Sequence, residues 1–143
     1  TDKRKGEKVF VVGEQGIIDE LNRIGIETRG GSEFENSEPD FTKGKKFEVD
    51  PKITAVVVGF DKKINYYKIN YAQICINELD AIFIATNLDK TGHITRDDQE
   101  WAAGGTIVAA VQHSAKKPFR LVGKPDETLV NYVAQKEKVI FFL

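Results

Sequence analysis

The feature that most constrains this chain is a series of short, continuous apolar runs, each followed at once by a glycine or a polar turn. Four such runs, with the turns that follow them, are residues 9–12 before Gly13-Glu14, residues 53–58 before Gly59-Phe60-Asp61, residues 81–85 before Thr86-Asn87-Leu88-Asp89, and residues 119–122 before Gly123-Lys124-Pro125. Runs of this length without polar alternation are typical of strands buried on both faces of a parallel sheet. A fifth run, residues 139–143, has the same character.

Helical patterns separate these runs. The predicted helices cover residues 15–24, 66–79, 106–114 and 126–136, and a short strand is predicted at residues 26–28. In the second helix the apolar stripe consists of Tyr66, Ile69, Ala72 and Ile76. Strands that alternate with helices indicate the α/β class, with an open, mostly parallel sheet flanked by helices. Ligands of such folds gather outside the carboxyl ends of the strands, so the four turns after the strands are the first place to look for chemistry.

Composition narrows the function classes. Twenty-one Lys plus Arg against 22 Asp plus Glu give a net charge of −1, so no overall basic field attracts nucleic acid or an anionic membrane. The single cysteine, Cys75, excludes a disulfide framework and favours a reducing compartment. No apolar run reaches the roughly 18 residues of a membrane span. We therefore expect a cytoplasmic protein that binds neither nucleic acid nor membrane.

Both ends indicate that the chain is one part of a longer protein. It begins at Thr1 and contains no methionine, so we expect it to be a segment of a longer reading frame. At the other end, the apolar run 139–143 is expected to join a sheet that continues beyond Leu143.

Residues 29–52 form a long polar stretch that predicts a loop. A loop of that length inside a compact domain is usually functional, disordered or a junction between units.

The segment Asn87–Asp98 resembles a calcium-binding loop. Oxygen donors stand at its first, third, fifth and ninth positions, glycine at the sixth and a carboxylate at the twelfth. An EF-hand, however, needs an entering helix, and a predicted strand precedes this segment. Calcium binding is therefore the weaker interpretation of the pattern.

Three further local features each have two interpretations. Gly104-Gly105 before a helix presents backbone N–H groups to an anion or forms a tight turn, the commoner use of paired glycines. His93 and His113 lack metal-ligating companions, and His113 is expected on a helix surface. Lys124 follows a strand and precedes a proline, which suits either a phosphate-binding lysine on a rigid scaffold or an ordinary surface lysine.

Several segments, taken in order, resemble the haloacid-dehalogenase superfamily, in its 4-nitrophenylphosphatase, phosphoglycolate phosphatase and pyridoxal phosphatase branch. The segments are Val9-Phe10-Val11-Val12-Gly13, Ala55-Val56-Val57-Val58-Gly59-Phe60-Asp61, Tyr66-Tyr67-Lys68, Phe83-Ile84-Ala85-Thr86-Asn87-Leu88-Asp89, Gly104-Gly105-Thr106 and Val122-Gly123-Lys124-Pro125. The resemblance implies that residues 8–118 are the α/β cap of such a phosphatase. Residues 119–143 would begin the return to the Rossmann-like core.

The resemblance also implies roles for particular residues. Lys124 matches the lysine that balances the charge of the nucleophilic aspartate and the bound phosphate. Asn87 and Asp89 match the Thr-Asn-x-Asp turn, and the substrate-specificity loop that follows corresponds to Lys90, Thr91, Gly92 and His93. The resemblance thus implies that all six residues bind substrate. The helix at 104–114 matches the segment through which such caps form homodimers.

The family's other motifs would lie outside this chain. Its Asp-x-Asp nucleophile belongs upstream of Thr1, and its Gly-Asp motif, which binds the Mg²⁺ of the full-length protein, belongs after Leu143. We therefore expect a phosphomonoester hydrolase of small phosphorylated metabolites as the parent protein and an inactive chain when it is alone. Alternatives from the residues themselves are a non-catalytic module that binds calcium or another small ligand, and a receiver-like or flavodoxin-like domain.

Overall fold

The computed structural model describes residues 7–123. Lys124, the predicted helix at 126–136 and the predicted strand at 139–143 lie outside the described residues. The elements in chain order are β1 (Lys8–Val12), α1 (Gln15–Arg23), β2 (Glu27–Gly30), the 3₁₀ helix η1 (Gly31–Phe34), β3 (Ile53–Val58), α2 (Tyr66–Glu78), β4 (Ile82–Ala85), β5 (Thr91–Gly92), β6 (Trp101–Ala102), α3 (Gly104–Ser114) and β7 (Arg120–Leu121).

Five of the described strands form one parallel sheet in the order β2-β1-β3-β4-β7. The chain crosses from β1 to β2 on one side and then continues on the other side through β3, β4 and β7. This is the doubly wound order of flavodoxin-like sheets, with its switch point between β1 and β3. The fold class predicted from the sequence is therefore confirmed.

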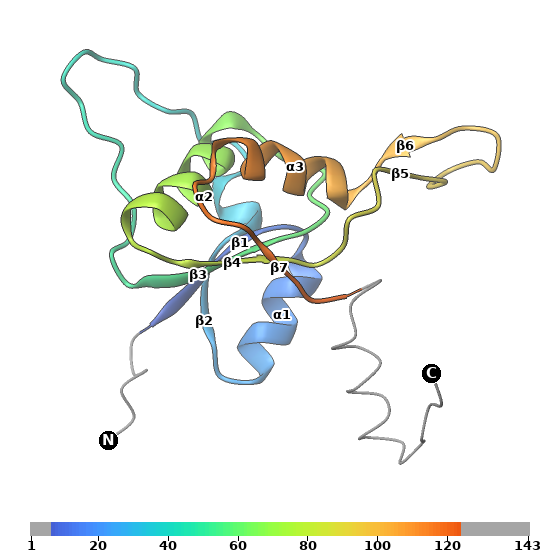
Figure 1. Ribbon diagram of the computed structural model, residues 1–143, viewed down its shortest axis with the longest axis horizontal. Coiled ribbons are helices and arrows are strands. Elements are labelled where there is room, and N and C mark those ends of the chain that lie inside the picture. The colour runs from blue at the N-terminus through green and yellow to red at the C-terminus, as the bar shows by residue number, and fades with distance from the viewer. Residues whose placement is uncertain (1–6, 124–143) are drawn as a thin grey trace.

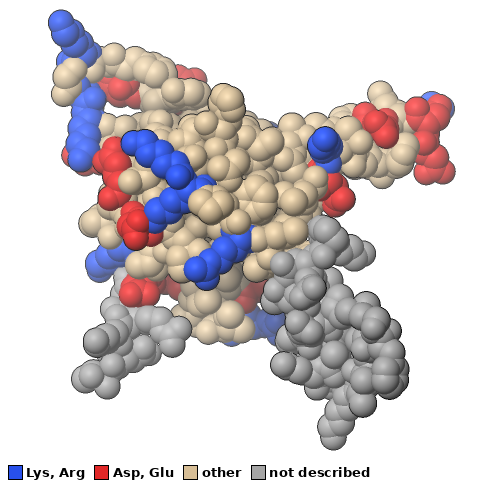
Figure 2. Space-filling view, in the orientation of Figure 1, with Lys and Arg blue, Asp and Glu red and all other residues tan. Residues whose placement is uncertain are grey.

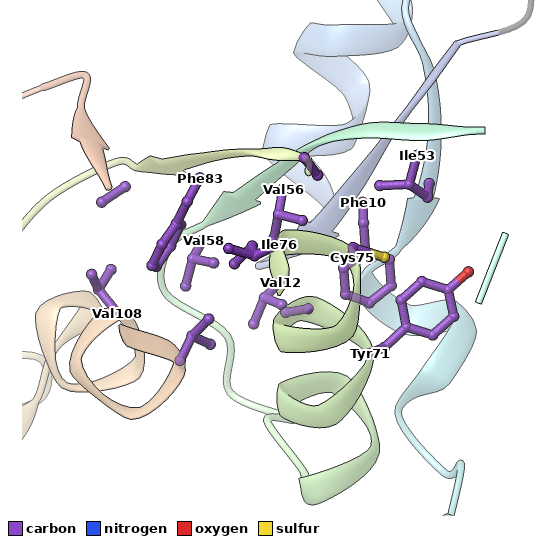
Figure 3. Packing of buried hydrophobic residues seen from close by; sticks show 14 of the residues in the cluster. Phe10, Val12, Ile53, Val56, Val58, Tyr71, Cys75, Ile76, Phe83 and Val108 are labelled. Atoms are coloured by element: carbon purple, nitrogen blue, oxygen red, sulfur yellow. The ribbon is translucent and has the colours of Figure 1, made fainter. Parts of the chain in front are cut away.

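The direction of the crossovers decides which face each helix covers. Connections between parallel strands are right-handed, so α1 covers one face of the sheet while α2 and α3 cover the other (Figure 1). The larger hydrophobic core lies under α2 and α3. Figure 3 shows Phe10, Val56 and Phe83 of the sheet facing Cys75 and Ile76 of α2, all of them buried. Burial of these side chains is the main force that holds the sheet and helices together.

The long polar stretch is more ordered at its start than its composition indicates. β2 runs to Gly30 and η1 follows directly, so the irregular part covers residues 35–52. Phe47 packs on Tyr67 with a ring separation of 4.8 Å, and Asp50 N–H donates to the hydroxyl of Tyr71 at 2.7 Å. These contacts attach the end of the loop to α2 through Tyr67 and the buried Tyr71.

Three predictions about elements were wrong in detail. The sequence predicts only a polar loop between the strand at 81–85 and Gly104, but β5 and β6 pair there as an antiparallel hairpin. Helix α3 begins at Gly104 and not after the glycine pair. The buried face of α2 contains Tyr71, Ala72 and Cys75, whereas Tyr66 is 60% exposed.

Candidate functional site

The carboxyl ends of four strands are level with one another. Val12, Val58, Ala85 and Leu121 are register partners across β1, β3, β4 and β7. The backbone hydrogen bonds between the strands continue one residue beyond them, since Gly59 N–H donates to the carbonyl of Val12 at 2.8 Å. Likewise, Thr86 N–H donates to the carbonyl of Val58 at 3.0 Å, and Val122 N–H donates to the carbonyl of Ala85 at 2.9 Å. The four turns singled out in the sequence thus leave the sheet along one edge.

The turn after β4 is organised by side chains. Thr86 Oγ1 donates to Oδ1 of Asn87 at 3.2 Å, and Nδ2 of Asn87 donates to Oδ2 of Asp89 at 3.0 Å. Asn87 is half-buried while Asp89 is exposed. The structure therefore brings these two predicted site residues together, with Asp89 at the solvent side of the edge.

Gly104 and Gly105 allow α3 to pack closely against the turn after β4. A Cβ at Gly105 would lie 2.5 Å from the carbonyl carbon of Leu88, and one at Gly104 would lie 2.5 Å from Oδ1 of Asn87. Gly105 N–H donates to the carbonyl of Asp89 at 2.9 Å. The pair is therefore not a tight turn before the helix, and its anion interpretation stays a prediction. The glycines form the first turn of α3 and let it rest on the turn after β4.

The chain passes close to Thr86 again at the end of β7. A Cβ at Gly123 would lie 2.1 Å from the carbonyl oxygen of Thr86, and Gly123 has φ of +156°. Only a glycine fits this approach without a backbone shift. Lys124 is bonded to Gly123 and lies outside the described residues, so its predicted role stays a prediction.

The remaining loop residues lie on a projecting arm. Lys90 is fixed by its carbonyl, which accepts from Thr106 Oγ1 at 2.8 Å and from Ala103 N–H at 3.0 Å. Thr91 and Gly92 then form β5, and His93 follows as an exposed residue. The hairpin extends away from the body of the molecule, with acidic side chains toward its far end (Figures 1 and 2). The loop predicted to contact substrate is thus freely accessible.

The calcium-like pattern does not form an EF-hand. Strand β4 precedes it and β5 lies within it, and several of its oxygen donors already accept hydrogen bonds from protein groups. Thr95 Oγ1 accepts from the indole of Trp101 at 3.1 Å, and both carboxylate oxygens of Asp98 accept from Arg96. In residues 7–123 no three His, Cys, Asp or Glu side chains are grouped so that they can hold a metal ion.

Sequence reasoning missed an ion pair buried at the same edge. Lys68 Nζ donates to Oδ2 of Asp61 at 2.8 Å, and the two side chains are 1% and 3% exposed. Oδ1 of Asp61 accepts from Lys63 N–H at 2.8 Å. The position of Asp61, just past the end of β3, was the available signal, but nothing in the sequence marks Lys68 as its partner.

Glu14 joins this group from the turn after β1. Its Oε1 accepts from Lys62 N–H at 2.8 Å, and Oε2 lies 3.2 Å from the ammonium of Lys62. The pKa of Glu14 is lowered, chiefly by the Lys62 N–H bond, with smaller contributions from the charges of Lys62 and Lys68. Glu14 is therefore ionised at neutral pH and connects the β1 and β3 turns.

The chain resembles known phosphatases in both sequence and fold. No protein-family model matches it. It is 43% identical to phosphoglycolate phosphatase 1A, chloroplastic, of Arabidopsis thaliana, over 92% of this chain and 36% of that protein. The p-nitrophenyl phosphatase from Archaeoglobus fulgidus is 25% identical with a TM-score of 0.69, over 94% of this chain and 43% of the other. The fold also matches a glycerol phosphate phosphatase of Mycobacterium tuberculosis solved with magnesium, at 21% identity and a TM-score of 0.69, over 93% of this chain and 35% of that one.

The fold and these similarities define the chain as a relative of haloacid-dehalogenase-like phosphatases. More particularly, it belongs with the branch of 4-nitrophenylphosphatases and phosphoglycolate phosphatases, as a partial length of such a protein. The chain spans 36–44% of the length of the first phosphoglycolate phosphatases that it matches. None of the helices between residues 7 and 123 has the length and apolar character needed to cross a membrane.

Proposed function

We propose that this chain is the cap, with one catalytic lysine, of a phosphomonoester hydrolase that acts on small phosphorylated metabolites. The observation that supports this most is the convergence at the turn after β4. Gly123 approaches Thr86, and the start of α3 packs against Asn87 and Leu88 of the same turn. Gly123 leads directly into Lys124. Loop residues suited to selecting a substrate and a lysine suited to holding its phosphate thus originate from one place.

The proposed division of labour follows from charge and position. The Lys124 ammonium offsets the negative charge of the phosphoryl group and of a carboxylate nucleophile, which form an aspartyl-phosphate intermediate. Lys90, Thr91, Gly92 and His93 contact the organic part of the substrate from the arm. A loop on an exposed hairpin can change its contacts without disturbing the sheet, which suits a specificity function.

Magnesium, implied for the full-length protein, finds no fitting site among residues 7–123. Mg²⁺ is held through carboxylates and other oxygen ligands, and the described part of the chain has no suitable group. In a phosphatase the ion neutralises phosphate charge. We propose that its ligands and the nucleophile belong to other parts of a longer polypeptide, and no role of the residues above depends on the ion.

The first test compares the 143-residue chain with the longer protein. With Mg²⁺ present, the chain alone is expected to release no 4-nitrophenol from 4-nitrophenyl phosphate and no phosphate from 2-phosphoglycolate. The longer protein should hydrolyse a phosphate ester of this kind. Turnover by the short chain that is lost in Lys124→Met would contradict the assignment of a cap. A longer protein without phosphatase activity would overturn the proposed function.

The second test separates the two proposed roles. In the longer protein, Lys124→Met should lower kcat for every phosphate ester, by about 10²-fold or more for one preorganised charge. His93→Ala should instead change the ratio of kcat/KM between 2-phosphoglycolate and 4-nitrophenyl phosphate. Lys52→Met is the control, because Lys52 is exposed and lies before β3, at the opposite edge of the sheet. An unchanged ratio in His93→Ala and Lys90→Ala would remove the arm from substrate selection.

We also propose that the cap forms a homodimer through α3. The side of this helix away from the core presents Thr106, Ala109, Ala110 and His113, all of them exposed. Small side chains let another helix approach closely, so a second copy can pack there without opening the core.

A further inference from the structure

A small crevice lies at the switch point of the sheet, on the side away from the β4 turn. It has a volume of about 160 Å³. Its lining comes from the turns after β1, β2 and β3 and from α2: Gly13, Glu14, Gln15, Gly31, Ser32, Glu35, Asp61, Lys63 and Lys68. The crevice beside a switch point is where open α/β sheets place their ligands.

Lys68 gives the crevice a buried hydrogen-bond donor with unused capacity. An ammonium has three donors, and burial of an unsatisfied polar group costs free energy. The side chain is 1% exposed, and within the described part of the chain its one hydrogen-bond acceptor is Asp61. Two N–H groups of this buried cation are therefore free to donate to a group that enters the hollow.

The carboxylates next to Lys68 are already engaged. Oδ1 of Asp61 accepts from Lys63 N–H, and Oδ2 accepts from the Lys68 ammonium. Both oxygens of Glu14 interact with Lys62. Of the acids that line the crevice, Glu35 is the one without an ion pair among the described residues, and it is exposed at the rim.

Other groups around the hollow are donors. The ammonium of Lys63 is exposed and has no carboxylate within salt-bridge distance in residues 7–123. Helix α1 begins at Gln15, and the Glu14 side chain does not cap it. The Ile17 N–H donates to the Glu14 carbonyl at 3.1 Å, so the N–H groups of Gln15 and Gly16 and the positive end of the helix dipole remain at this edge.

We propose that the crevice binds a small oxyanion, either a carboxylate or a phosphate group, on Lys68, Lys63 and the first turn of α1. The volume equals about five water molecules, at roughly 30 Å³ each, which suits a group of that size. The site lies beside β1 and not beside β4, so the inference goes beyond the proposed function and stands without it. Positive and negative charges nearly balance around the crevice, so binding relies on hydrogen bonds and is of millimolar strength.

The test is an NMR titration of the 143-residue chain with inorganic phosphate at constant ionic strength, with chloride as the reference ion. Phosphate should cause saturable shifts at the amides of Gln15, Gly16, Ser32 and Lys63. Acetate is titrated in parallel, and the tighter of the two ions identifies the oxyanion as phosphate or carboxylate. Saturable shifts by neither ion at these amides would overturn the proposal.

Removal of a positive or a negative charge at the rim should change the affinity for the ion in opposite directions. Lys63→Gln should weaken the binding of the tighter ion and Glu35→Gln should strengthen it, each by about two- to fivefold, as for one exposed charge. Lys52→Gln, remote from the crevice, should leave it unchanged. Equal affinities in Lys63→Gln, Glu35→Gln and Lys52→Gln would contradict the proposal.

Removal of the buried donor completes the test. The double variant Asp61→Asn with Lys68→Met removes both buried charges together and should lose saturable binding. Unchanged affinity in a folded double variant would overturn the proposal. If that variant does not fold, the opposite signs in Lys63→Gln and Glu35→Gln still decide the matter.

Discussion

Asp61 and Lys68 stabilise the fold only as a pair, because each neutralises the buried charge of the other. The pair joins the turn after β3 to α2, and both charges are nearly inaccessible to water. Two buried charges are tolerable while they neutralise one another, whereas a single one left behind is costly.

Removal of one partner should therefore destabilise the protein strongly. Lys68→Met leaves Asp61 buried and uncompensated, and should lower the free energy of unfolding by about 3–5 kcal/mol. Restoration of neutrality with Asp61→Asn in the same chain should recover much of that loss. Urea denaturation followed by circular dichroism gives both values. Arg96→Met, which breaks the exposed pair with Asp98, is the control and should cost at most about 1 kcal/mol.

Two glycines should respond to alanine in opposite ways. At Gly105 the added methyl would meet the backbone of Leu88 at 2.5 Å, so Gly105→Ala should displace α3 and destabilise the protein. At Gly16, inside α1, nothing lies within 4 Å of the added carbon. Gly16→Ala should stabilise by up to about 1 kcal/mol, because it restricts the unfolded chain and favours helix. Thermal unfolding of the two variants checks the signs, and equal effects would refute the packing account.

Cys75 makes stability fall at alkaline pH. Burial raises the pKa of its thiol from 9.0 to about 12, so above pH 9 the unfolded chain loses a proton that the folded chain keeps. The protonated thiol's contribution to the free energy of unfolding is therefore fully present below pH 9 and is lost as the pH rises toward 12. Desolvation also raises the pKa of Tyr71, which acts in the same direction. Denaturation curves from pH 8 to 11 should show a smaller decline in Cys75→Ala than in the original chain.

At the scale of elements, the arm formed by β5 and β6 is the least supported part of the described structure. Its strands pair over two residues each, and the side chains from His93 to Trp101 are exposed. A two-stranded hairpin of this size is marginal in water, and such elements open before the rest of a domain.

The single tryptophan reports on this opening. Trp101 lies in β6 and donates to Thr95 within the arm. Its fluorescence should change at lower urea concentration than the circular dichroism of α1, α2 and α3. Thr106→Val removes the bond to the Lys90 carbonyl and should move the fluorescence transition to still lower urea. Superimposable transitions would mean that the arm unfolds together with the sheet.

Helices and strands could be predicted where their buried faces leave a regular apolar pattern in the sequence. β1, β3 and β4 are apolar runs, and the helices between them follow the helical period, so their order and the edge where turns gather could be predicted. The hairpin carries no such pattern, because Thr91-Gly92 and Trp101-Ala102 are too short and too exposed. The face of α2 was misjudged because Lys68 is buried through Asp61, and long-range pairing of charges has no local signal.

At the scale of the whole molecule, the exposed small residues of α3 predict self-association. Ala109→Arg places a long charged side chain in the middle of the proposed contact and should shift the chain from dimer to monomer in sedimentation velocity. Asn22→Arg adds the same charge on α1 and should not. If the original chain sediments as a monomer throughout the micromolar range, the dimer is rejected for this length of chain.

The strand order also affects how the chain folds while it is being made. β1 is synthesised before the other four described strands of its sheet, yet it lies inside the sheet, between β2 and β3. Forty residues separate Val12 from the start of β3 at Ile53, so one edge of β1 has no partner until that later strand has left the ribosome. Parallel pairing over such distances in sequence is slow, and unpaired apolar edges invite association with other chains. The nascent polypeptide thus passes through an interval in which residues 8–12 are vulnerable to aggregation, and a slower supply of later residues would prolong it.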